Sequence, residues 1–136
     1  MKITKTIKAL YIEHLDKQVE KYWNIYHFNM EPNHVSHNNE GDAFKHCYMS
    51  AELTLLLGYS LAKKLTDKHE NWEGNPENEK LMDLHNNEVG LRIGKKVRKG
   101  IMWPFKKWDD IIAEKVMECM EKNYLITKPV EGFDIS

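Results

Sequence analysis

The sequence is poor in cysteine, which limits both its redox chemistry and its metal sites. Cys47 and Cys119 are the two cysteines among 136 residues, and both lie within apolar helical patterns. Because unpaired cysteines of this kind are usually buried, they are expected to be reduced thiols of a protein made in the cytosol rather than a disulfide. Their spacing also provides no cysteine-based zinc site.

The sequence also lacks a long hydrophobic run and an excess of charge of one sign. No stretch approaches the roughly 18 apolar residues of a membrane-spanning helix, and no signal peptide is recognisable. We therefore expect a cytoplasmic protein as made, which would leave the cell only through a dedicated delivery system. The net charge is −1, so any preference for a polyanion must come from a local patch.

Alternation with a period of two is absent, whereas apolar residues recur at helical spacing along most of the chain. A chain of 136 residues is expected to form a single domain, residues 1–136. The sequence therefore predicts an all-α, single-domain bundle of about four main helices around a buried central helix. The central helix begins at Asp42 as its N-cap and is apolar on nearly every side. The expected helices cover residues 3–28, 42–66, 76–99 and 107–123.

The stretch MDLHNNEVG crowds polar side chains into the third expected helix. Asparagine is a poor helix former because its amide competes for backbone hydrogen bonds. The presence of Asn86 and Asn87 inside a helix therefore requires an explanation. By helical angle Asp83 and Asn87 share one stripe, which continues into two glycines that would let another backbone or a ligand come close. Asn86 lies on the apolar stripe, and His85 lies on the opposite flank. The cluster either satisfies a buried network or holds a ligand, and the spacing favours neither.

Further polar groups lie near the two ends of the expected central helix. His46 falls in its first turn, where the helix dipole disfavours imidazolium and would hold a neutral ring ready as base or metal ligand. A hydrogen-bonded core histidine is the alternative. His69 and Glu70 follow where the helix ends. Antiparallel packing predicts that Glu70 approaches Asp83 and that His46 lies far away, near the end of the third helix.

A basic and aromatic segment, residues 92–108, follows the polar cluster and contains no acidic residue. Such a segment suits a phosphate-rich partner, either a nucleic-acid backbone or an anionic membrane surface. The alternative is a solvated helix end followed by a turn that packs on the core. The residues expected to contact the partner are Arg92, Lys95, Lys96, Arg98, Lys99, Trp103, Lys106 and Lys107.

Three motifs resemble those of an uncharacterised helical family of bacterial and phage proteins, which also occurs as the last module of polymorphic toxins. The motifs are GDAFKHCYMSAELT, DKHE and NPENEKLMDLHNNEVGLRIG, and the resemblance covers about residues 41–95. Met49 stands where the family pattern has an aromatic residue, and Lys45 stands where arginine is usual. The matching positions are Asp42, Lys45, His46, Cys47, Ser50, His69, Glu70, Asp83, His85, Asn86, Asn87 and Gly90.

The toxin context of that resemblance implies a small hydrolytic domain. We expect a hydrolase of phospholipid or nucleic acid in which a polar centre activates water. A divalent metal such as zinc, held by carboxylates, is the candidate cofactor. The expected catalytic residues are His46, Glu70, Asp83, His85 and Asn87. The expected metal ligands are His46, His69, Glu70 and Asp83. The alternative is a non-catalytic helical module whose polar residues form one buried hydrogen-bond network.

Overall fold

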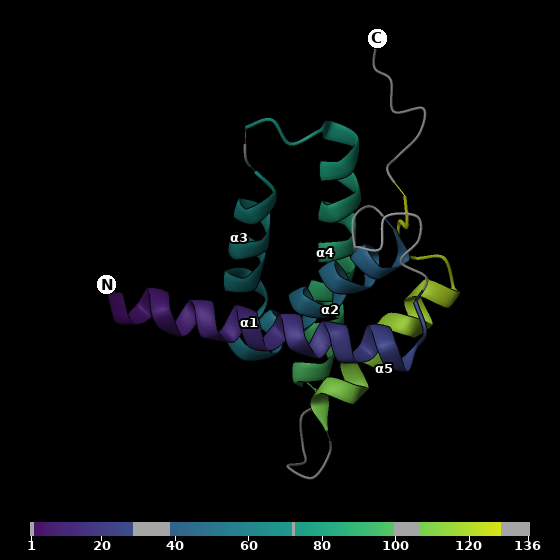
Figure 1. The fold of residues 1–136 in the computed structure, drawn as a ribbon, viewed down its shortest axis with the longest axis horizontal. Coiled ribbons are helices and arrows are strands. Elements are labelled where there is room, and N and C mark those ends of the chain that lie inside the picture. Colours follow the sequence, from purple (N-terminus) through teal and green to yellow (C-terminus); the bar gives the residue numbers. More distant parts are fainter. Residues whose placement is uncertain (1, 29–38, 72, 100–106, 129–136) are drawn as a thin grey trace.

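The computed structural model describes residues 2–28, 39–71, 73–99 and 107–128, and within these ranges every regular element is a helix (Figure 1). The fold is the all-α single-domain bundle that the sequence predicts. The helices are α1 (Lys2–Ile25), α2 (Glu40–Leu57), α3 (Tyr59–Glu70), α4 (Glu77–Lys99) and α5 (Trp108–Glu121). None of these helices is long and apolar enough to cross a membrane.

Helix α2 is the centre of the bundle and packs against each of the other four helices (Figure 1). Its most extensive contact is with α4, while α1 crosses it on one side. Phe44 and Tyr48 of α2 are fully buried, and the tilted ring of Tyr22 from α1 meets both of them. The prediction of a buried central helix is therefore confirmed, although Leu56 near its end is 57% exposed.

The prediction of one helix over residues 42–66 is wrong, because the chain breaks at Gly58. The φ angle of Gly58 is +88°, a left-handed value that residues with a side chain rarely adopt. Its N–H donates to the carbonyl of Thr54 at 2.8 Å and closes α2, while its own carbonyl accepts from Ala62 at the start of α3. Helix α3 then turns back and runs beside α4 (Figure 1). The apolar pattern continues through the break, so periodicity alone does not reveal it.

The start of α2 also differs from the prediction. Asn39 is the N-cap, and its side-chain oxygen accepts the backbone N–H of Asp42 at 2.9 Å. Asp42 is thus not the N-cap but a residue of the first turn. Since the capping role belongs to Asn39, the carboxylate of Asp42 is available for contacts inside the bundle.

Helices α2 and α4 approach each other closely at two glycines of α4. A Cβ atom at Gly90 would lie 2.1 Å from the carbonyl oxygen of Cys47, and one at Gly94 would lie 2.4 Å from that of Ala51. These are contacts between backbones, so no side-chain adjustment could relieve them. The glycines that follow Asp83 and Asn87 on the same stripe therefore bring α2 against α4, as the sequence suggested.

Candidate functional site

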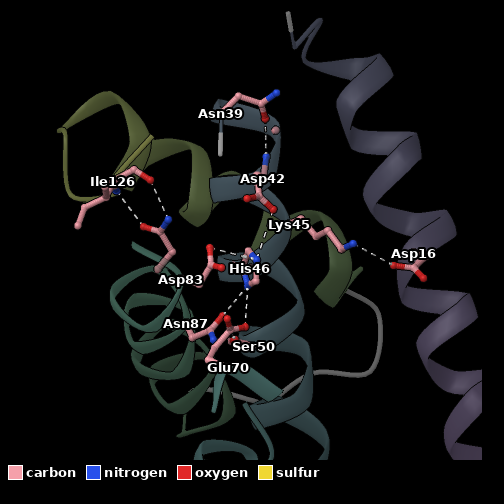
Figure 2. Close-up of polar contacts among 12 residues, drawn as sticks. Asp16, Asn39, Asp42, Lys45, His46, Ser50, Glu70, Asp83, Asn87 and Ile126 are labelled. Carbon is pink, nitrogen blue, oxygen red and sulfur yellow. Dashed lines mark hydrogen bonds and ion pairs between the residues drawn. The ribbon is translucent and has the colours of Figure 1, made fainter. Parts of the chain in front are cut away.

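The imidazole of His46 lies at the centre of a polar cluster built by α2, α3 and α4 (Figure 2). Its Nε2 atom is 3.3 Å from Oδ1 of Asp42 and 3.3 Å from Oδ1 of Asp83. Its Nδ1 atom is 3.6 Å from Oε1 of Glu70 and 3.1 Å from Oδ1 of Asn87. Four of the predicted site residues, together with Asp42, therefore converge in one place.

The break at Gly58 is what brings Glu70 to His46. In one straight helix these two residues would be about 36 Å apart, at about 1.5 Å per residue. Because α3 folds back along α4, Glu70 instead lies 3% exposed beside the His46 ring, at the last residue of α3. The expectation that His46 lies far from Glu70 and Asp83 is therefore wrong.

Asp42 is a residue of the cluster that the predicted site omitted. It is buried and lies one helical turn before His46, so both side chains project from the same face of α2. The spacing Asp-x-x-x-His could have identified it. It was interpreted as a helix cap, and the true cap lies three residues earlier, at Asn39.

Asn87 connects the cluster to the body of α2. Its Oδ1 atom accepts a hydrogen bond from the hydroxyl of Ser50 at 3.2 Å and faces Nδ1 of His46. An amide oxygen is an acceptor, so this contact requires a proton on Nδ1. Asn87 thereby fixes the orientation of the ring and leaves Nε2 directed at the two aspartates.

Several negative charges surround one imidazole, and the pKa values of the cluster follow from this crowding. Burial alone would lower the pKa of His46, but the hydrogen bond to Asp42 and the charges of Asp83 and Glu70 raise it above its usual range. Burial raises the pKa of Asp83 to about 7; the charge of His46 opposes this effect, and the nearby Glu70 and Asp42 increase it. A cluster of this kind attracts a proton or a cation.

Nε2 of His46 and the two aspartate oxygens beside it are close enough together to share one metal ion. Ligand atoms of Asp42, His46 and Asp83 all lie within 4.8 Å of one another. Bonds of about 2.0–2.2 Å in a tetrahedral arrangement place neighbouring ligand atoms about 3.3–3.6 Å apart. The two 3.3 Å separations fall in that range and exceed the about 2.7–2.9 Å of a strong charge-assisted hydrogen bond. Among the described residues, none makes a hydrogen bond to the buried atoms Oδ1 of Asp83 and Oε1 of Glu70.

Two predicted residues lie outside the cluster. His69 is exposed on α3 and is not part of the group that could hold an ion. His85 is exposed on α4 and donates from Nε2 to the carbonyl of Tyr124 at 2.6 Å. Both roles proposed from sequence, His69 as a metal ligand and His85 as a catalytic residue, therefore have no geometric support in the described structure.

Asn86 has a separate task from Asn87. Its side-chain amide donates to the carbonyl of Ile126 at 2.8 Å, and its side-chain oxygen accepts the Ile126 N–H at 2.9 Å (Figure 2). It is fully buried and binds the chain that follows α5 to α4. The sequence allowed two interpretations of the cluster, a buried network or a ligand site. Asn86 fits the first, because it holds a loop, and Asn87 fits the second, because it faces the polar centre.

The part of the basic segment that belongs to α4 lies further along that helix than the His46 cluster. Arg92, Lys95, Lys96, Arg98 and Lys99 are exposed on the last turns of α4. Lys95 is about 18 Å along the helix from Asp83, at about 1.5 Å per residue. Lys107 is exposed before α5, whereas Trp103 and Lys106 lie outside the described residues. The five cations of α4 consequently lie at a different level of that helix from Asp83 of the His46 cluster.

The fold and the cluster together define a class: a small all-helical domain with a buried histidine surrounded by carboxylates. Within that class, the chain belongs to the family described as "Domain of unknown function (DUF6973)", which matches residues 4–124. No solved structure matches the chain.

Proposed function

We propose that this protein is a metal-dependent hydrolase whose centre is formed by Asp42, His46 and Asp83. The observation that carries the proposal is the pair of 3.3 Å separations that direct two carboxylates at Nε2 of one histidine. Three protein ligands leave a fourth position for water or substrate, the arrangement typical of catalytic rather than structural zinc.

Each residue of the cluster has a place in this chemistry. A divalent cation bound there would supply a Lewis acid and lower the pKa of a coordinated water. The proton on Nδ1 of His46 would be held by Asn87, whose amide is oriented in turn by Ser50, as metal-bound histidines require. Glu70 is buried beside His46 and adjoins Asp83, and in this proposal it accepts a proton from the attacking water.

A phosphate-containing substrate, either phospholipid or nucleic acid, fits this centre best. A divalent cation neutralises the charge that develops on phosphoryl oxygens during hydrolysis. The toxin-module context that the motif resemblance implies would be consistent with the same reaction class. A cluster with this excess of carboxylates would repel a phosphate in the absence of a cation, so metal binding must precede substrate binding.

The test combines metal content with isosteric variants. Purified protein is titrated with zinc, analysed for bound metal, and assayed with bis(p-nitrophenyl) phosphate and with phospholipid. We expect about one ion per chain, an increase in melting temperature on binding, and loss of activity with EDTA. Asp42→Asn, His46→Gln and Asp83→Asn should each reduce metal content and lower activity at least a hundredfold. Asp67→Asn, which removes a carboxylate from the outside of α3, is the matched control and should leave both unchanged.

The alternative, a non-catalytic module in which the cluster is a structural network, predicts a different pattern. Each replacement would then leave a buried partner unpaired and lower the free energy of unfolding by about 1–3 kcal/mol. Under the metal hypothesis, Asp83→Asn relieves charge repulsion, so the metal-free variant should be as stable as the parent or more stable. Unfolding of all three variants without any metal uptake by the parent protein would refute the proposal.

A further inference from the structure

Helices α2 and α4 run in roughly the same direction where they touch. Near the start of α4, Asp83 meets His46 of α2, and further along, Gly94 meets the carbonyl of Ala51. Position along α4 therefore increases together with position along α2. The last residue of α3, Glu70, lies beside His46 as well. The first turns of α2 and α4 and the last residue of α3 thus share one end of the bundle, which we call the cluster end.

The cluster end is rich in carboxylates. The first turn of α2 contains Glu40 and Asp42, and the first turn of α4 contains Glu77 and Glu79. Glu79 precedes Asp83 by four residues, so these two side chains are neighbours on one stripe of α4. A helix dipole favours acidic residues in a first turn, which accounts for each pair separately. It does not account for carboxylates beyond the first turn, such as Asp83, at the same end of the molecule.

Two lysines that are close to the cluster in sequence make contacts elsewhere. Lys45 extends away from the cluster, and its ammonium is 3.9 Å from Oδ1 of Asp16 of α1 (Figure 2). Lys80 donates to the side-chain oxygen of Asn71 at 2.9 Å. No lysine or arginine of the described residues pairs with Glu70, whose buried Oε1 atom also accepts no hydrogen bond from them. The negative charge of the cluster end is therefore only partly balanced by basic side chains.

This charge restricts the substrates that the proposed centre can take. A divalent ion would balance its two aspartate ligands and attract one phosphate group, while the remaining carboxylates would stay negative. Proteins bind a nucleic-acid backbone by neutralising several phosphates with lysine and arginine, and the cluster end offers few of these. The exposed cations at the other end of α4 begin at Lys95, about 18 Å from Asp83 at about 1.5 Å per residue. A polynucleotide at the centre would therefore place further phosphates against carboxylates.

We propose that the substrate of the His46 centre is a phosphodiester that carries an ammonium group, as the zwitterionic headgroups of phospholipids do. This inference rests on the proposed hydrolase and specifies its substrate. The ion binds the phosphate, and the carboxylates of the cluster end attract the ammonium group beside it. Hydrolysis adds water across one phosphorus–oxygen bond: the water oxygen joins phosphorus, and the departing oxygen takes a proton. The ammonium group is not consumed, so it contributes to binding and orientation.

The test compares two chromogenic diesters of matched shape on the zinc-loaded protein. p-Nitrophenyl phosphorylcholine carries the ammonium group, whereas p-nitrophenyl 3,3-dimethylbutyl phosphate has an uncharged tert-butyl group in its place. We expect kcat/KM to be at least about tenfold higher for the choline ester at low salt, and the ratio to shrink at high salt because the attraction is screened. A single-stranded polynucleotide should be cleaved more slowly than either diester.

Charge-neutral variants locate the preference at the cluster end. Glu77→Gln combined with Glu79→Gln should reduce the ratio of the two kcat/KM values to below about threefold, because the attraction for the ammonium group is weakened. The matched control, Glu114→Gln with Glu118→Gln, removes the same charges from exposed positions of α5 and should keep the ratio of the parent. Zinc content and melting temperature, measured for every variant, distinguish a lost preference from a lost centre or a lost fold.

The possible failures of the two proposals are distinguishable. Zinc-dependent hydrolysis of both diesters at equal kcat/KM would overturn this inference and leave the hydrolase standing. Faster cleavage of the polynucleotide, or a ratio that falls equally in the α5 control, would do the same. A parent protein that binds no zinc would refute the hydrolase, and this inference would fall with it.

Discussion

Glu52 is a buried carboxyl group on the side of α2 that meets α5. It is 7% exposed and neighbours Asp109 of α5 and the hydroxyl of Tyr48. Burial raises its pKa to about 8, and the hydrogen bond and negative charge of Asp109 add to the effect, while Tyr48 opposes it. Nearby, Tyr22 of α1 donates to Asp110 at 2.5 Å, so α1, α2 and α5 meet around these groups. Glu52 is consequently protonated in the folded protein at neutral pH.

The raised pKa predicts how stability depends on pH. In the unfolded chain Glu52 ionises near its ordinary pKa of 4.5, whereas in the folded protein it keeps its proton up to about 8. Between these values the folded state binds more protons, so the free energy of unfolding falls as pH rises. Glu52→Gln removes this loss and should stabilise the protein at pH 8 by up to about 4 kcal/mol, at about 1.4 kcal/mol per unit of pKa, with little change near pH 5.

Urea unfolding at pH 5 and pH 8, in the presence of a chelator, measures this difference. Glu118→Gln, an exposed position on α5, is the control and should keep the pH dependence of the parent protein. An identical pH dependence in Glu52→Gln and the parent would show that Glu52 ionises normally in the folded protein.

At the scale of helices, the contact between α2 and α4 depends on the absence of two side chains. A methyl group at Gly90 would overlap the backbone of Cys47, and the carbonyl it meets is itself part of the α2 hydrogen-bond ladder. Only a movement of one helix away from the other can make room. Because Asp42 and His46 lie on α2 while Asp83 and Asn87 lie on α4, the same movement would open the His46 cluster.

Gly90→Ala should therefore lower both stability and metal affinity. Alanine favours a helix over glycine by about 1 kcal/mol, but the overlap should outweigh this and leave a net loss of at least about 2 kcal/mol. Thermal unfolding and zinc titration of the variant measure the two effects. Ser60→Ala, at an exposed position of α3, controls for the added helix propensity and should leave both quantities nearly unchanged. A variant as stable as the parent would contradict the close backbone contact.

At the scale of the whole molecule, hydrophobic period predicted the class of fold and most helix positions. The expected helices 3–28, 76–99 and 107–123 correspond to α1, α4 and α5, with differences of a few residues at their ends. A 3.6-residue period reports which face is buried, and that information is present in each segment separately. It does not report whether two apolar segments form one helix or two, which is why the break at Gly58 was missed.

Four members of the candidate site could be predicted from the sequence, but Asp42 and the assembly of the site could not. The motif residues His46, Glu70, Asp83 and Asn87 were all selected from sequence, yet a continuous helix over 42–66 predicted that His46 lies far from the rest. Helix α3 folds back at Gly58, whose φ angle is positive, and the hydrophobic period does not reveal this turn. Asp42 was missed for a local reason, since the same residue type serves as a helix cap or as a ligand, and only the position of Asn39 decides between them.

The paired hydrogen bonds between Asn86 and Ile126 predict that the two residues differ in how readily they can be replaced. Asn86 contributes its side chain, and no other residue of that length offers one donor and one acceptor side by side. Ile126 contributes only its backbone N–H and carbonyl, which nearly every amino acid possesses. Ile126→Ser and Ile126→Lys should therefore keep the chain after α5 attached, whereas Ile126→Pro removes the donor and should release it, as amide hydrogen exchange around residues 124–126 would show. Of these two residues in direct contact, Ile126 should therefore tolerate many replacements other than proline, whereas Asn86 should tolerate few.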